Sequence, residues 1–103
     1  MADPMRIRAT EKDGEVDVKV LMKHDMESGQ RKDAAGAIIP AWHITNLSAT
    51  VNDKQVFAAQ FGPAISKDPF LNFKFKGAAK GDVVIVSWED TKGDKRTDKA
   101  KIS

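Results

Sequence analysis

The chain contains no cysteine and no tyrosine among its 103 residues. Without a thiol it cannot form a disulfide, a thiolate zinc site or an iron–sulfur cluster, and it has no cysteine nucleophile. The absence of disulfides does not fix the compartment, because a core of this size can be stable without them. The chemistry open to the chain is limited to its other side chains.

Neither sign of charge dominates, and no long apolar run is present. Lys and Arg number 17 and Asp and Glu 15, which gives a net charge of +2. This balance argues against a protein that binds nucleic acid or an anionic membrane. No stretch approaches the roughly 20 apolar residues of a transmembrane helix, and the N-terminus lacks the apolar run of about 7–15 residues of a signal peptide. These features alone predict a cytoplasmic protein.

Length and composition predict a single globular domain over residues 1–103. Apolar residues make up 41% of the chain and charged residues 31%, as in folded proteins. Alternating apolar and polar residues mark about seven short strands with turn residues between them and no helix. This pattern predicts an all-β, two-sheet sandwich of immunoglobulin-like type. The strands are expected at residues 5–10, 15–22, 37–47 continuing into 48–51, 55–61, 68–75, 83–88 and 95–102.

Three segments also predict the place of a strand or turn within the sandwich. Val83–Trp88 is apolar on both faces and is expected to be a central strand. The lysines of Lys95–Ile102 are typical of a sheet edge that is protected against pairing with other chains. Asn52–Lys54 separates two strand patterns and predicts a hairpin turn.

A long polar connection, Lys23–Gly36, separates the second and third predicted strands. It shows no helical pattern and far exceeds the usual hairpin loop of about 2–5 residues. Loops of this length in compact domains are often functional. The connection is therefore the first place to look for chemistry or for a partner.

The two histidines, His24 and His43, are the first candidates for a metal or redox site. The segment His24–Glu27 also contains Asp25, Met26 and Glu27, but a stable site needs three or four ligands that converge. A loop histidine held by local hydrogen bonds is the competing interpretation for His24. The acidic segment Asp90–Asp94 is interpreted as a turn, since it lacks the alternating oxygen ligands of a calcium loop.

Apolar side chains exceed what one small core needs. Large apolar residues occur on both faces of some predicted strands, so some of them should be exposed, contact another protein or be covered by loops. Exposed apolar patches and aromatic residues are typical of protein interfaces. The residues concerned are Ile38, Ile39, Trp42, Phe57, Phe61, Phe70 and Trp88.

Several segments together resemble the SoxZ family. Residues 23–33 read Lys-His-Asp-Met-Glu-Ser-Gly-Gln-Arg-Lys-Asp and are followed by Ile-Pro-Ala-Trp at 39–42. This is similar to the His-x-Met-Glu-x-Gly … Ile-Pro-Ala signature of that family. The resemblance continues through residues 52–56, 68–73 and 88–93 and spans nearly the whole chain.

The resemblance implies an immunoglobulin-like sandwich and a subunit that is not an enzyme and has no cofactor. In the family, the SoxYZ complex carries sulfur during bacterial thiosulfate oxidation, on a cysteine in the C-terminal Gly-Gly-Cys-Gly-Gly arm of SoxY. The implied partners are SoxY, in a heterodimer, and transiently other sulfur-oxidation enzymes, with no nucleic acid or membrane. It also implies a periplasmic protein exported with its partner, which replaces the cytoplasmic expectation.

An apolar face outside the clearest core positions is expected to hold SoxY. Two alternatives stay open: a small metal-binding redox protein that uses His24 and His43, and a generic β-sandwich binding module for adhesion or sugars. The residues expected to contact the partner are Met26, Ile39, Trp42, Phe57, Phe61 and Phe70.

Overall fold

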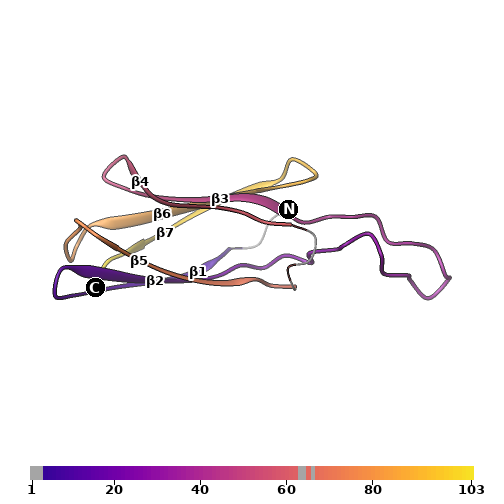
Figure 1. The fold of residues 1–103 in the computed structure, drawn as a ribbon, viewed down its shortest axis with the longest axis horizontal. Coiled ribbons are helices and arrows are strands. Elements are labelled where there is room, and N and C mark those ends of the chain that lie inside the picture. The colour runs from indigo at the N-terminus through magenta and orange to yellow at the C-terminus, as the bar shows by residue number, and fades with distance from the viewer. Residues whose placement is uncertain (1–3, 63–64, 66) are drawn as a thin grey trace.

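The protein is a sandwich of two antiparallel sheets, seen edge-on in Figure 1. The computed structural model describes residues 4–62, 65 and 67–103. Within these residues every regular element is a strand, and no helix is long and apolar enough to cross a membrane. The strands are β1 (Arg6–Lys12), β2 (Glu15–Leu21), β3 (Ile44–Val51), β4 (Lys54–Gln60), β5 (Phe70–Lys76), β6 (Val83–Asp90) and β7 (Lys95–Lys101).

The sheets have the strand orders β1-β2-β5 and β4-β3-β6-β7. This confirms the predicted all-β sandwich, with β6 as a central strand and β7 at an edge. In an immunoglobulin constant domain the fourth strand joins the sheet of the first two strands. Here β4 instead pairs with β3, so the three-stranded sheet keeps β5 as an open edge.

Two of the hairpin turns are set by backbone conformation. Asp13 and Gly14 have φ values of 54° and 83°, and Asn52 and Asp53 have φ values of 52° and 64°. Positive φ at both central residues is the mark of a type I′ turn, whose twist matches that of paired strands. These turns join β1 to β2 and β3 to β4 and confirm the predicted hairpin at Asn52–Lys54.

The core lies between the central strands of the two sheets. The inward-facing residues Val16, Val18 and Val20 of β2 and Val84 and Val86 of β6 are fully buried. They follow the period-two alternation that predicted these strands. β6 is apolar on its outer face as well, but that face is open to solvent.

One side of the sandwich is closed by contacts between β1 and the C-terminal segment. The Ser103 N–H donates to the carbonyl of Ala9 (3.0 Å), and the Glu11 N–H donates to the carbonyl of Ser103 (2.8 Å). The Met5 N–H donates to the Asp98 carboxylate (2.9 Å). The Arg96 guanidinium, which bonds both Asp98 oxygens, is the main cause that lowers the pKa of Asp98.

The predicted strand at 37–47 is wrong in its first part, because β3 begins only at Ile44. Residues 27–42 instead form a projecting ribbon, with antiparallel bridges at Glu27↔Trp42 and Lys32↔Ile38. The ribbon extends beyond the ends of both sheets on the right of Figure 1. The molecule is accordingly elongated, with extents of 53 × 21 × 19 Å.

The sequence predicts Met26, Phe57 and Phe61 as partner contacts outside the clearest core positions. The structure instead places all three in or against the core. Met26 is 6% exposed, and both phenylalanines pack against the buried cluster. The Phe57 ring stacks on that of Phe73, with centroids 4.3 Å apart and planes at 8°. Phe57 reaches the core because it is paired with the buried Ala49 across the β3–β4 ladder, and directly opposed residues lie on the same face of a sheet.

Replacing Phe57 should therefore destabilise the fold. We expect Phe57→Ala to lower the free energy of unfolding by about 2–3 kcal/mol, because the stacked ring leaves a cavity. Phe70→Ala is the matched control, since the Phe70 side chain is 63% exposed, and it should cost less than about 1 kcal/mol. Urea unfolding followed by tryptophan fluorescence measures both. Equal losses for the two variants would contradict the placement of Phe57 in the core.

Candidate functional site

Three side chains meet at the root of the ribbon and form an anchor, defined here as His24, Trp42 and Asp90. His24 and Asp90 are only 6% and 4% exposed. His24 Nε2 lies 3.0 Å from Asp90 Oδ2, and Trp42 Nε1 donates to the same oxygen at 2.7 Å. The anchor thus joins the end of β6 to both branches of the ribbon.

The hydrogen bonds of the two His24 ring nitrogens show which nitrogen carries the proton. The backbone N–H of Met26 donates to His24 Nδ1 at 3.0 Å, so Nδ1 must be an acceptor and carry no proton. The proton of the neutral imidazole therefore sits on Nε2 and is donated to Asp90. A second proton on Nδ1 would face the Met26 N–H and break that bond.

Asp90 uses its other oxygen to form the β6–β7 turn. Asp90 Oδ1 accepts from the backbone N–H groups of Lys92 and Asp94, each at 2.9 Å. Burial alone would raise the pKa of Asp90, but the hydrogen bonds from His24, Trp42 and the two backbone N–H groups outweigh it and lower that pKa. The carboxylate is therefore held in its charged form by four donors.

Ring contacts complete the anchor. The His24 ring lies 4.8 Å from the Trp42 ring at 58° and 5.3 Å from the Trp88 ring at 86°. The Lys92 Nζ also lies 4.0 Å from the centroid of the Trp42 ring, a cation–π contact. Contacts with a buried histidine and a surface lysine thereby fix where the returning branch of the ribbon re-enters the sandwich.

Beyond the anchor, hydrogen bonds between residues of the ribbon hold it in shape. The Arg31 guanidinium makes a bidentate contact with Glu27, which lowers the pKa of Glu27. Asp33 Oδ1 accepts from the N–H groups of Ala35 and Ala37 and shapes the tip. All residues of the segment 30–38 are exposed.

The six residues predicted to contact a partner do not form one surface. Met26 is buried at the anchor, where its Sδ accepts from the Ile44 N–H at 3.4 Å. Ile39 and Trp42 are half-buried in the ribbon and the anchor. Phe70 is 63% exposed on β5. The other two, Phe57 and Phe61, pack on the core.

Comparison with known families identifies the chain. The family model described as "Sulphur oxidation protein SoxZ" matches residues 5–101. The chain belongs to the SoxZ family. A role in sulfur oxidation, with SoxY as the partner in that system, follows from this membership. No curated protein sequence matches the chain.

The metal alternative does not fit the histidines of this SoxZ-family chain. Both ring nitrogens of His24 are already bonded, to Asp90 and to the Met26 N–H. His43 Nδ1 lies 3.0 Å from the backbone oxygen of Ile44. Among residues 4–62, 65 and 67–103, no three His, Cys, Asp or Glu side chains are grouped to hold a metal ion.

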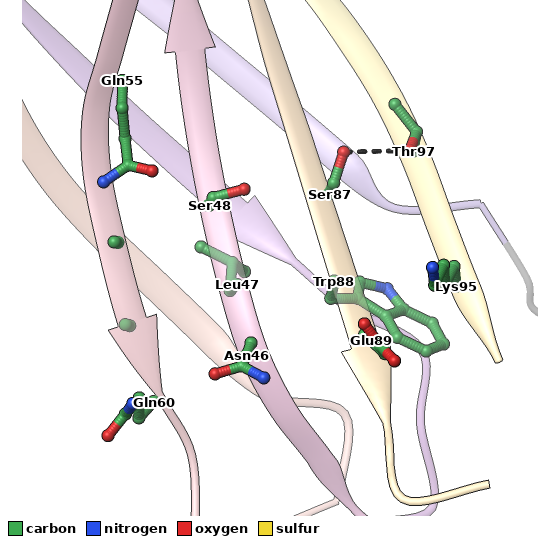
Figure 2. A pocket seen from close by; sticks show the side chains of 12 residues that line it. Asn46, Leu47, Ser48, Gln55, Gln60, Ser87, Trp88, Glu89, Lys95 and Thr97 are labelled. Carbon is green, nitrogen blue, oxygen red and sulfur yellow. Dashed lines mark hydrogen bonds between the residues drawn. The ribbon is translucent and has the colours of Figure 1, made fainter. Parts of the chain in front are cut away.

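The outer face of the four-stranded sheet has a hollow of about 540 Å³, whose polar side chains appear in Figure 2. Ser48 and Ser87 are paired across β3 and β6, and the Ser87 hydroxyl lies 2.9 Å from that of Thr97. An activated serine needs an adjacent base. The described lining residues include one carboxylate, Glu89, and no histidine.

The contact between His24 and Asp90 was not predicted from the sequence, although a signal was present. Both residues continue the inward alternation of a central strand: Met22 is followed by His24, and Trp88 by Asp90. The interpretation of Asp90–Asp94 as a turn is correct, but it accounts for only one of the two Asp90 oxygens. The local hydrogen bond expected for His24 is also present.

The Asp90 carboxylate of the anchor should make the free energy of unfolding depend on pH in the acid range. Because the folded-state pKa of Asp90 lies below its ordinary 3.8, the unfolded chain binds more protons between the two values. The stabilisation is fully present above that ordinary value and is lost as the pH falls through the folded pKa. We expect Asp90→Asn to lower the free energy of unfolding at pH 7 by about 3 kcal/mol and to lose less on acidification than the original chain.

Urea unfolding of both proteins from neutral to acid pH measures this difference. Glu89→Gln is the control, since this neighbouring carboxylate is exposed and should leave the profile unchanged. Parallel pH profiles for the Asp90→Asn variant and the original chain would contradict the anchor.

Proposed function

We propose that this chain is the non-catalytic subunit of a heterodimeric sulfur carrier and that it binds SoxY. In the pair, the C-terminal cysteine arm of SoxY carries the sulfur substrate of thiosulfate oxidation. The observation that carries the proposal is the projecting ribbon, in which the apolar residues 37–41 lie outside the core that the described residues form. Membership of the SoxZ family supports it.

The ribbon has the composition of a binding element. Its returning branch places Ala37, Ile38, Ile39, Pro40 and Ala41 in succession, and the Ile38 side chain is 62% exposed. An isolated two-stranded hairpin is at best marginally stable in water. Exposed apolar groups on such a ribbon gain most by burial against another protein.

The anchor favours binding by fixing the ribbon beforehand. A segment that is already ordered loses less conformational entropy when it meets a partner. His24 and Trp42 hold the two branches where they leave the sandwich, and the Asp33 side chain holds the tip. The ribbon therefore offers Ile38 and Ile39 on a preformed support, which is the role we assign to the buried network.

The division of chemistry between the subunits follows from the cysteine count. The chain has no cysteine, so it has no thiol on which a sulfur intermediate can be carried covalently. SoxY supplies that thiol in this proposal, and the chain described here positions SoxY for the enzymes that visit the arm transiently. The pair would work in the periplasm, with export directed by the partner.

The ribbon contact is tested by Ile38→Asp. We expect this variant to weaken binding to SoxY by about tenfold or more, because a buried apolar contact is replaced by a charge. Its folding should be unchanged, since Ile38 is exposed at the ribbon tip. Isothermal titration of purified chain into SoxY measures the affinity.

Ile85→Asp is the matched control, because Ile85 is also exposed, at 40%, but lies on the outer face of β6. It should bind SoxY as the original chain does. A folded Ile38→Asp variant with unchanged affinity would refute the ribbon contact.

A further inference from the structure

The outer face of the three-stranded sheet carries a second distinctive surface, at the end nearest the ribbon. The strand register aligns Arg6, Leu21 and Phe70 in one row across β1, β2 and β5, and Arg8 and Lys19 in the next outward-facing row. We call these five residues the basic–apolar patch. They line a hollow of about 310 Å³ together with Ile7.

The positively charged residues of the patch form no ion pair within the described part of the chain. Arg6, Arg8 and Lys19 are all exposed, and none of them belongs to the ion pairs formed by described residues. The carboxylate of Asp17, in the next row, accepts a hydrogen bond from the Asn72 amide at 2.5 Å. Three cations therefore face solvent beside an apolar side chain.

Protection of a sheet edge explains only part of this arrangement. Arg6 and Arg8 lie on the edge strand β1, where charged side chains deter pairing with other chains. Lys19 lies on the central strand β2 and needs no such role. Phe70 is 63% exposed on the other edge strand, where an exposed apolar side chain favours association with another chain instead of preventing it.

We infer that the basic–apolar patch is a docking site for an extended acidic segment of another protein that carries one bulky apolar side chain. Arg6 and Arg8 are two residues apart on one strand, which places their side chains about 6.8 Å apart on the same face. Alternate residues of an extended peptide repeat at the same distance, so carboxylates at alternate positions can meet both arginines. The apolar side chain then packs on Phe70 and Leu21.

The spacing of the cations favours a peptide over a lipid surface. The charges lie to one side of Phe70, across β1 and β2, rather than around it. The hollow of about 310 Å³ can accept a single side chain. The patch does not include the ribbon and does not depend on the proposed binding of SoxY.

The test uses a fluorescein-labelled peptide with aspartates at alternate positions followed by a single leucine. Fluorescence anisotropy with the full chain should show saturable binding that weakens as salt is added. Replacing the aspartates by lysines should abolish binding, and replacing the leucine by alanine should weaken it.

Arg8→Glu combined with Lys19→Glu should lower the peptide affinity by about tenfold or more. Lys99→Glu combined with Lys101→Glu makes the same change in net charge on the exposed face of β7 and should have little effect. Phe70→Ser should also weaken binding.

Binding of SoxY separates this inference from the proposed function. The Arg8→Glu, Lys19→Glu variant should still bind SoxY, and Ile38→Asp should still bind the peptide. The inference is overturned by peptide binding that is insensitive to the patch variants, by loss of SoxY binding in the Arg8→Glu, Lys19→Glu variant, or by patch-dependent binding to phosphatidylglycerol vesicles without binding to the peptide.

Discussion

His24 and Asp90 meet across the sandwich, 3.0 Å apart, where two inward-facing rows of side chains end. Each row belongs to a central strand of a different sheet and is apolar until its last member. A charged carboxylate is tolerated at this depth because it receives hydrogen bonds from His24, Trp42 and two backbone N–H groups. The same carboxylate therefore closes the end of the core, shapes the β6–β7 turn and fixes both branches of the ribbon.

This arrangement separates a rigid support from an exposed binding element. The sandwich buries its apolar side chains between β2 on one side and β3 and β6 on the other. The ribbon beyond Glu27 and Trp42 has no comparable core. Residues 30–38 of the ribbon are all exposed, so the ribbon contributes little to folding. Loops held on a rigid scaffold are where binding functions concentrate.

The sequence predicted most of the fold because its strands alternate strictly. Val16, Val18 and Val20 on β2 and the glycine- and asparagine-containing turns left little ambiguity. The start of β3 is misplaced because residues 37–42 are apolar without being buried between the sheets; they belong to the projecting ribbon. Local pattern also does not show that Phe57 faces the core, since its face is set by pairing with the buried Ala49 of β3. The contact between His24 and Asp90 joins residues 66 positions apart, which no local pattern specifies.

Amide hydrogen exchange of the ribbon, with and without bound SoxY, tests most directly that this segment binds the partner. In the free chain, the exposed amides of residues 30–38 should exchange rapidly. In the complex, we expect their exchange to slow by at least about tenfold, because binding buries the ribbon and removes its amides from solvent. A stable complex that leaves exchange in the ribbon unchanged and protects another face would contradict the role assigned to it.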